Sequence, residues 1–169
     1  MRSSGARLEA SSLAERLPRR AGLRFISISP LPTVDGGLEL LTADGATAAR
    51  LQRAMRGLEM EFSLRVRGEL QPSQREAILS GALDSGVLQV RLLEPAGGEG
   101  SNRWYRLIAV GASGNEVRQL VERAAATLVR MLRTRIGALN LPRTLPRGRW
   151  RELSEQELAS VSGNPGSDH

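Results

Sequence analysis

The clearest pattern in the chain is the alternation in residues 58–70, LEMEFSLRVRGEL. Apolar side chains occupy every second position from Leu58 to Val66, and glutamate, serine and arginine occupy the positions between them. Successive side chains of a β-strand point to opposite faces, so this period of two predicts a strand with one buried face. The stretch therefore predicts a sheet whose core lies on the side of Met60, Phe62 and Leu64.

The sequence on either side of this strand interleaves strands with helices. Further strands are predicted over residues 23–29, 38–41, 87–93, 103–110 and 128–136. Helices are predicted over residues 46–56, 72–79 and 115–126, and a short one is opened by Ser154, with Glu157 completing a capping box. The segment 139–153 is expected to be extended. Several of the segments that connect the predicted elements are short enough for hairpins. We therefore expect an α+β fold with a mixed, mainly antiparallel sheet and flanking helices.

The chain of 169 residues is the size of one ordinary domain. We expect that domain over residues 12–158, between disordered tails at 1–11 and 159–169. A short helix is expected near 12–17. The arginine- and serine-rich start also resembles a transit peptide, but a frayed tail explains it more simply.

Composition excludes several classes of chemistry. There is no cysteine and the single histidine is the last residue, His169, so thiolate nucleophiles, histidine triads and Cys/His metal sites are excluded. No apolar run is long enough to span a membrane. The 24 basic residues are all arginine, and the net charge of +6 favours an anionic partner such as nucleic acid. A GC-rich genome explains the arginine content equally well.

Several stretches, taken together, resemble one family. They are GLELLTADG (37–45), EMEFSLRVRG (59–68), GGEGSNRWY (97–105), NEVR (115–118), RMLRTRIG (130–137) and LPRGRWREL (145–153). In this order and spacing they are similar to the RsuA-type ribosomal RNA pseudouridine synthases, in particular the large-subunit branch. The resemblance implies a catalytic domain with an RNA cleft in a mixed, mainly antiparallel sheet, without metal or cofactor. It also implies RNA, in particular ribosomal RNA, as the partner. The absence of lysine, of cysteine and of a signal sequence fits a cytoplasmic location. The family's N-terminal S4 domain is expected to be missing.

The resemblance also shows where this sequence departs from the family. Members of the family isomerise an extruded uridine through an aspartate, and that position is Pro32 here. Proline offers no nucleophile. We therefore expect an RNA-binding protein with lost or weak isomerase activity, and whether it is an enzyme stays open. The family's base-stacking tyrosine falls at Phe62, and the arginine that pairs with the aspartate falls at Arg118.

Two alternatives remain. Asp35, in the Asp-Gly-Gly turn three residues after Pro32, can serve as a relocated carboxylate, although turn chemistry alone explains it. In that case the protein is an active pseudouridine synthase. The other alternative is a non-catalytic protein-interaction module. Arg118 has three alternatives: an ion pair with Asp35, a contact with RNA phosphate, or a solvated position on its helix.

Arginines and one tryptophan in the C-terminal part form the predicted RNA-binding set. Clustered arginines beside an aromatic ring suit binding to a phosphate backbone together with base stacking. Solvated surface arginines are the simpler alternative. The predicted contacts are Arg130, Arg133, Arg135, Arg143, Arg147, Arg149 and Trp150.

Overall fold

The computed structural model describes residues 5–8, 25–32, 34–98, 100–142 and 149–162. Its strands are β1 (Gly5–Leu8), β2 (Ile26–Ser27), β3 (Gly36–Thr42), β4 (Glu59–Arg67), β5 (Ala82–Leu83), β6 (Gly86–Val87), β7 (Gln89–Gly97), β8 (Asn102–Val110), β9 (Leu128–Ile136), β10 (Leu139–Asn140) and β11 (Trp150–Glu152). The helices are α2 (Gly45–Met55), α3 (Pro72–Ser80), α4 (Gly114–Arg123) and α5 (Glu155–Val161). Among the described residues no helix is long and apolar enough to cross a membrane.

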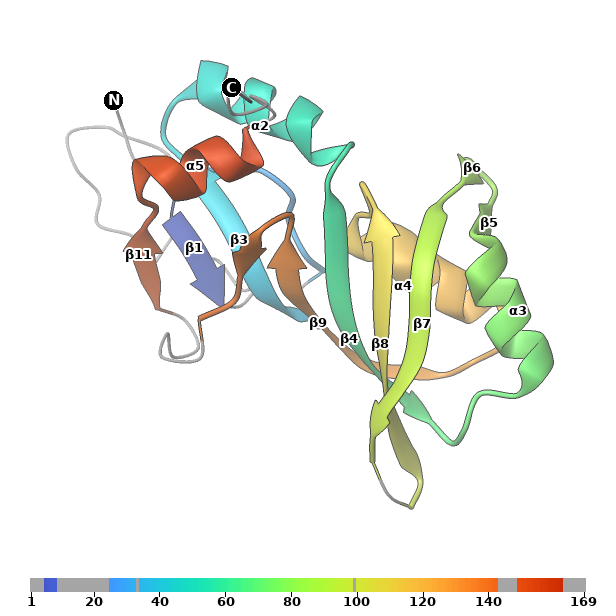
Figure 1. The fold of residues 1–169 in the computed structure, drawn as a ribbon. Helices are drawn as coiled ribbons and strands as arrows, with labels where there is room; N and C mark the ends of the chain where they lie inside the picture. The colour runs from blue at the N-terminus through green and yellow to red at the C-terminus, as the bar shows by residue number, and fades with distance from the viewer. Residues whose placement is uncertain (1–4, 9–24, 33, 99, 143–148, 163–169) are drawn as a thin grey trace.

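One sheet runs through the whole molecule (Figure 1). Its strand order is β11-β1-β3-β9-β4-β8-β7, with β2 added to β3 and β10 added to β9. Neighbouring strands are antiparallel except β3 and β9, which run parallel. The predicted α+β fold with a mixed, mainly antiparallel sheet is therefore confirmed.

Strand β4 lies near the middle of this sheet and behaves as its alternation predicts. Met60, Phe62, Leu64 and Val66 are buried, and the residues between them are partly exposed. The buried side chains belong to one core together with Val117, Leu120 and Val121 of α4. The predicted hairpin is also present, as β7 and β8.

The helices begin where capping residues satisfy their first backbone N–H groups. Asp44 accepts hydrogen bonds from the backbone of Ala46 and Thr47 at the start of α2. A capping box formed by Ser113 and Glu116 starts α4, and the predicted box of Ser154 and Glu157 starts α5.

The ends of the chain differ from the expected tails. Within residues 1–11, Gly5–Leu8 forms β1, which pairs with both β3 and β11. At the other end α5 continues to Val161, whose side chain is buried in the core. Backbone pairing and burial are tertiary effects, and neither short segment carries a local pattern that predicts them. The helix expected near 12–17 lies outside the described residues.

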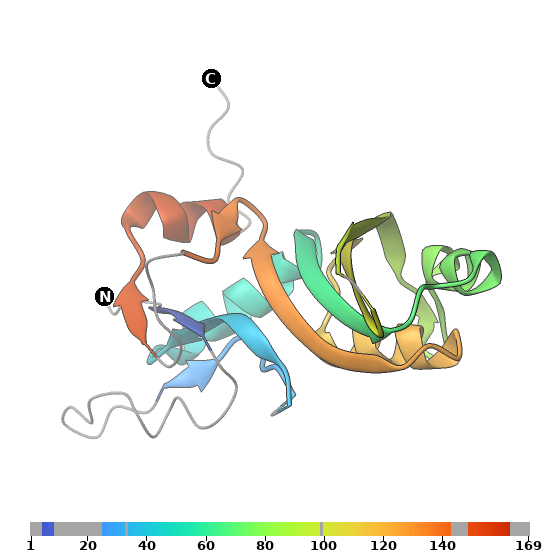
Figure 2. The same cartoon turned by 90° about the horizontal axis from the view of Figure 1, so that it is seen from below.

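The two faces of the β4–β8–β7 part of the sheet differ. Helix α4 lies behind these strands in Figure 1, on the side of the core. Figure 2 shows α5 on the other side of the sheet, over the β1–β3 end, with no helix over the front of β4, β8 and β7. We call that uncovered surface the open face.

Candidate functional site

Asp35 and Arg118 form a buried ion pair. The guanidinium of Arg118 donates from Nη2 to Asp35 Oδ1 at 2.5 Å and from Nε to Asp35 Oδ2 at 3.2 Å. The Asp35 side chain has no exposed surface, and that of Arg118 is 22% exposed. Two parallel N–H···O bonds are the strongest arrangement of this pair of groups. The predicted pairing of Arg118 with Asp35 is thus present in the structure.

Two local features bring the carboxylate to the arginine. The backbone N–H of Asp35 donates to the Pro32 carbonyl at 2.9 Å, which closes a tight turn just before β3. The same loop packs on the start of α4 at Gly114. A Cβ at that position would lie 3.0 Å from both Leu31 and Pro32, so the absence of a side chain allows this approach. Asp35 and Arg118 are 83 residues apart in the sequence.

The start of the loop is held by Arg133. Its guanidinium donates to the Leu38 carbonyl at 2.8 Å, to Ser29 Oγ at 3.0 Å and to the Ser29 carbonyl at 2.8 Å. The side chain is fully buried, which lowers its pKa to about 10, while the nearby Glu39 carboxylate opposes the shift. A pKa of about 10 still leaves Arg133 charged at neutral pH.

The predicted RNA contact at Arg133 is therefore wrong, because nothing of its side chain reaches the surface. It fixes Ser29 to β3 instead. The alternation along the strand could have predicted this burial. Side chains two residues apart point to the same face of a sheet, and Met131, two residues before Arg133, lies in the core.

Phe62 is also buried, as part of the hydrophobic core. Its ring, like the Asp35 carboxylate, has no exposed surface in the structure, and the base-stacking role stays a prediction. The same alternation that buries Met60 and Leu64 buries Phe62.

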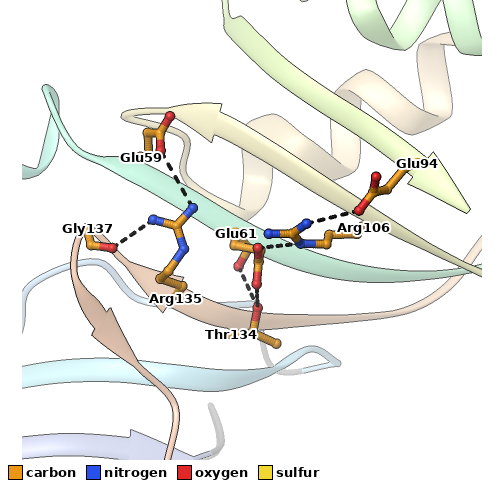
Figure 3. Close-up of polar contacts among 7 residues, drawn as sticks. All are labelled: Glu59, Glu61, Glu94, Arg106, Thr134, Arg135 and Gly137. Atoms are coloured by element: carbon orange, nitrogen blue, oxygen red, sulfur yellow. Dashed lines mark hydrogen bonds and ion pairs between the residues drawn. The ribbon is translucent and has the colours of Figure 1, made fainter. Parts of the chain in front are cut away.

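The other predicted RNA contacts do not form one surface. Arg130 and Arg135 lie on β9, whereas Arg149 and Trp150 are exposed at β11, with β1 and β3 between the two strands. Arg135 donates to the Gly137 carbonyl at 2.8 Å and pairs with Glu59 at 3.6 Å (Figure 3). The predicted contacts at Arg143 and Arg147 lie outside the described residues.

In the part of the chain that the structure describes, no three His, Cys, Asp or Glu side chains gather in a way that would hold a metal ion. The pair of Asp35 and Arg118 thus stands as a carboxylate beside a cation. A carboxylate of this kind can attack an electrophilic carbon or accept a proton.

Comparison with known proteins identifies the family. No family model matches the chain. The ribosomal large subunit pseudouridine synthase B of Yersinia pestis is 36% identical over 140 residues, which are 82% of this chain and 44% of the relative. The enzyme of the same name from Salmonella typhi is 36% identical over 150 residues, 88% of this chain and 52% of the relative. The chain belongs to the ribosomal RNA pseudouridine synthase family. It spans about half the length of the curated relatives it matches.

Solved structures show the same pseudouridine synthase fold. A pseudouridylate synthase crystal structure superimposes with a TM-score of 0.77 at 16% identity, covering 95% of this chain and 74% of that one. A chain of an archaeal box H/ACA ribonucleoprotein complex gives a TM-score of 0.58 at 14% identity, covering 86% of this chain and 51% of its own.

Proposed function

We propose that this protein binds ribosomal RNA and carries a weak uridine-to-pseudouridine isomerase activity that depends on Asp35. The observation that carries the proposal is the two-bond contact between Arg118 and the Asp35 carboxylate. The family resemblance assigns this arginine to the catalytic aspartate. RNA as the partner is supported by the names of the relatives, which are ribosomal large subunit pseudouridine synthases. A protein with this target would work in the cytoplasm, where ribosomes are made.

The proposed isomerisation uses only chemical groups of the protein and of the uridine. Uridine and pseudouridine are isomers: the bond from the ribose carbon C1′ to N1 breaks and a bond from C1′ to C5 forms. The hydrogen on C5 is lost as a proton to a base, and N1 gains a proton, so the atoms balance. A carboxylate is able to take part in such a step as a nucleophile. Arg118 would orient the Asp35 carboxylate through its two hydrogen bonds. The target base must first leave its stack, which costs a few kcal/mol that contacts in the pocket recover.

The activity is proposed to be weak for a geometric reason. A reacting atom has to come within about 3–3.5 Å of its target. The Asp35 side chain has no exposed surface, and both of its oxygens are engaged by Arg118. Each turnover therefore includes a step that uncovers the carboxylate, and the free energy of that step adds to the barrier.

RNA binding without isomerisation is the second candidate function. It is favoured by Pro32, which occupies the position that the resemblance assigns to the nucleophile. A non-catalytic role as a protein-interaction module would follow if RNA binding also failed.

The test is pseudouridine mapping on large-subunit ribosomal RNA incubated with three forms of the full chain. These are the unmodified protein, Asp35→Asn and Pro32→Asp. Asparagine keeps the size of the side chain but removes its charge, and Pro32→Asp restores a carboxylate at the family position. We expect slow product formation by the unmodified protein and none by Asp35→Asn. Circular dichroism and thermal unfolding check that each variant is folded.

Each result has a defined meaning. Product from Pro32→Asp alone, with RNA binding by all three forms, would support binding without isomerisation. Equal product from the unmodified protein and Asp35→Asn would exclude Asp35 as the acting carboxylate. If no form bound or modified RNA, the RNA function would be excluded for this chain.

A further inference from the structure

The two ends of the open face differ in whether their arginines have acidic partners. The first end carries three glutamates that engage the arginines around them (Figure 3). Arg106 pairs with Glu61 at 2.6 Å and with Glu94 at 2.9 Å. Glu59 pairs with Arg135 at 3.6 Å and with Arg91 at 3.4 Å. Every arginine named at this end therefore has an acidic partner.

The second end lies further along the same strands and carries arginines of another kind. Arg65 of β4 lies opposite Arg130 of β9, and two residues further along β4 Arg67 is exposed. Within the described part of the chain, none of these three side chains forms an ion pair. We call Arg65, Arg67 and Arg130 the unpaired arginines.

The placement of the unpaired arginines costs the isolated protein free energy. Like charges directly opposite each other on neighbouring strands are destabilising, because their side chains lie about 5 Å apart. Arg65 is also constrained by Trp104 of β8, since its guanidinium carbon lies 5.8 Å from the centre of the indole ring. In addition, the Nε atom of Arg65 is buried without a hydrogen-bond partner. A bound anion would relieve the repulsion.

We propose that the unpaired arginines form a second RNA contact, which binds the phosphate backbone on the sheet face opposite the Asp35–Arg118 pair. Charge complementarity selects the partner, because three adjacent guanidinium groups without carboxylates match a row of phosphates. Arg118 belongs to α4, on the covered side of the sheet, whereas Arg65 alternates with the buried Leu64 and Val66 and so points to the open face. The inference rests on RNA as the partner but not on any reaction of Asp35.

The geometry also suggests how such a contact would act. Phosphate contacts hold and orient an RNA but do not distinguish one base sequence from another. The second contact would thus add affinity and salt dependence and leave target choice to other parts of the protein.

The test compares two triple variants of the full chain that lose the same charge. Arg65→Gln, Arg67→Gln and Arg130→Gln remove the unpaired arginines. The control variant carries Arg91→Gln, Arg106→Gln and Arg135→Gln, which remove the paired arginines and leave their glutamates free. Binding of a short fluorescein-labelled RNA hairpin is followed by fluorescence anisotropy between about 50 and about 200 mM salt.

We expect the first variant to reduce the slope of log affinity against log salt by about 2 to 3, since each phosphate contact contributes about 0.7 to 0.9. Its affinity at low salt should fall about tenfold or more. The control should change the slope by less than about 1. If the first variant does not fold, the exposed single substitution Arg67→Glu tests the same surface and should weaken binding more than Arg106→Glu.

Equal slopes for the two triple variants would overturn the proposal. It would also be overturned if the protein self-associated and the first variant abolished that association, because a second copy would then cover this face. Asp35→Asn serves to separate this inference from the proposed isomerase activity. If Asp35→Asn keeps the full salt slope and the first variant loses it, the second contact stands whatever the mapping experiment finds.

Discussion

The Asp35–Arg118 pair and the glutamate–arginine cluster of the open face use the same chemical groups in opposite surroundings. Asp35 has no exposed side-chain surface, whereas Arg106 and Glu94 are 45% and 47% exposed. Water can replace a lost partner in the exposed cluster but has no access to the Asp35 carboxylate. The comparison teaches that similar hydrogen-bond lengths do not imply similar contributions to stability, because burial decides what a broken pair leaves behind.

The buried charges of this protein are also concentrated in one place. In the described part of the chain the buried charged residues are Asp35, Glu39 and Arg133. Asp35 precedes β3, Glu39 lies in it, and Arg133 is opposite Gly37 of β3 in the parallel pair with β9. Burying charge is costly unless it is paired and hydrogen-bonded. The charged side chains whose burial costs the most free energy thus cluster around the loop that carries Pro32 and Asp35.

The largest expected effect comes from removing the cation of the buried pair. Arg118→Met leaves the Asp35 carboxylate buried without its partner, which should lower the free energy of unfolding by about 3–5 kcal/mol. Asp35→Asn should cost less, since Arg118 is partly exposed and water can solvate its guanidinium. Chemical denaturation of both variants and of the double variant measures this difference. A cost below about 1 kcal/mol for Arg118→Met would mean that water reaches the pair.

A smaller effect is expected from the partly exposed pair of Arg151 and Glu157. Hydrogen bonds from the Arg151 guanidinium, aided by the backbone N–H of Ser154, lower the pKa of Glu157 from 4.5 to about 2. A pKa that is lower in the folded state stabilises the protein at pH above 4.5, and the stabilisation is lost as the pH falls toward about 2. The difference in melting temperature between the unmodified protein and Glu157→Gln should therefore shrink over that range. A difference that does not change with pH would contradict the assignment.

The smallest effect is expected in the exposed cluster. Glu94 and Glu61 raise the pKa of Arg106, but the side chain stays in contact with water. Arg106→Gln should change the free energy of unfolding less than the variants above, because exposed ion pairs contribute little to stability. A double-mutant cycle with Glu61→Gln isolates the pair. A coupling as large as that of Asp35 and Arg118 would remove the distinction between the two regions.

The sequence predicted the elements whose patterns are local. The alternation over 58–70 predicted β4, residues 128–136 predicted β9 with the same bounds, and the capping box of Ser154 and Glu157 marked the start of α5. It did not predict β1, because the four residues Gly5–Leu8 show no period and are ordered by pairing with β3 and β11. For the candidate site, the sequence indicated Asp35 and Arg118 as a possible pair. It misplaced Arg133, which is buried and bonded to Leu38 and Ser29 instead of reaching the surface.

Residue types alone excluded some chemistry: the given sequence has no cysteine and a single histidine, so thiolate nucleophiles and Cys/His metal sites are ruled out for it. Local spacing determined most strands and helices, because strand and helix periods depend on neighbouring residues. Only the tertiary structure decided which charges are buried and which meet. Asp35 and Arg118 come together across 83 residues because the loop that precedes β3 lies against the start of α4. Arg133 lies on the same face of β9 as the buried Met131, and only the tertiary structure supplies the Leu38 and Ser29 oxygens that accept its hydrogen bonds.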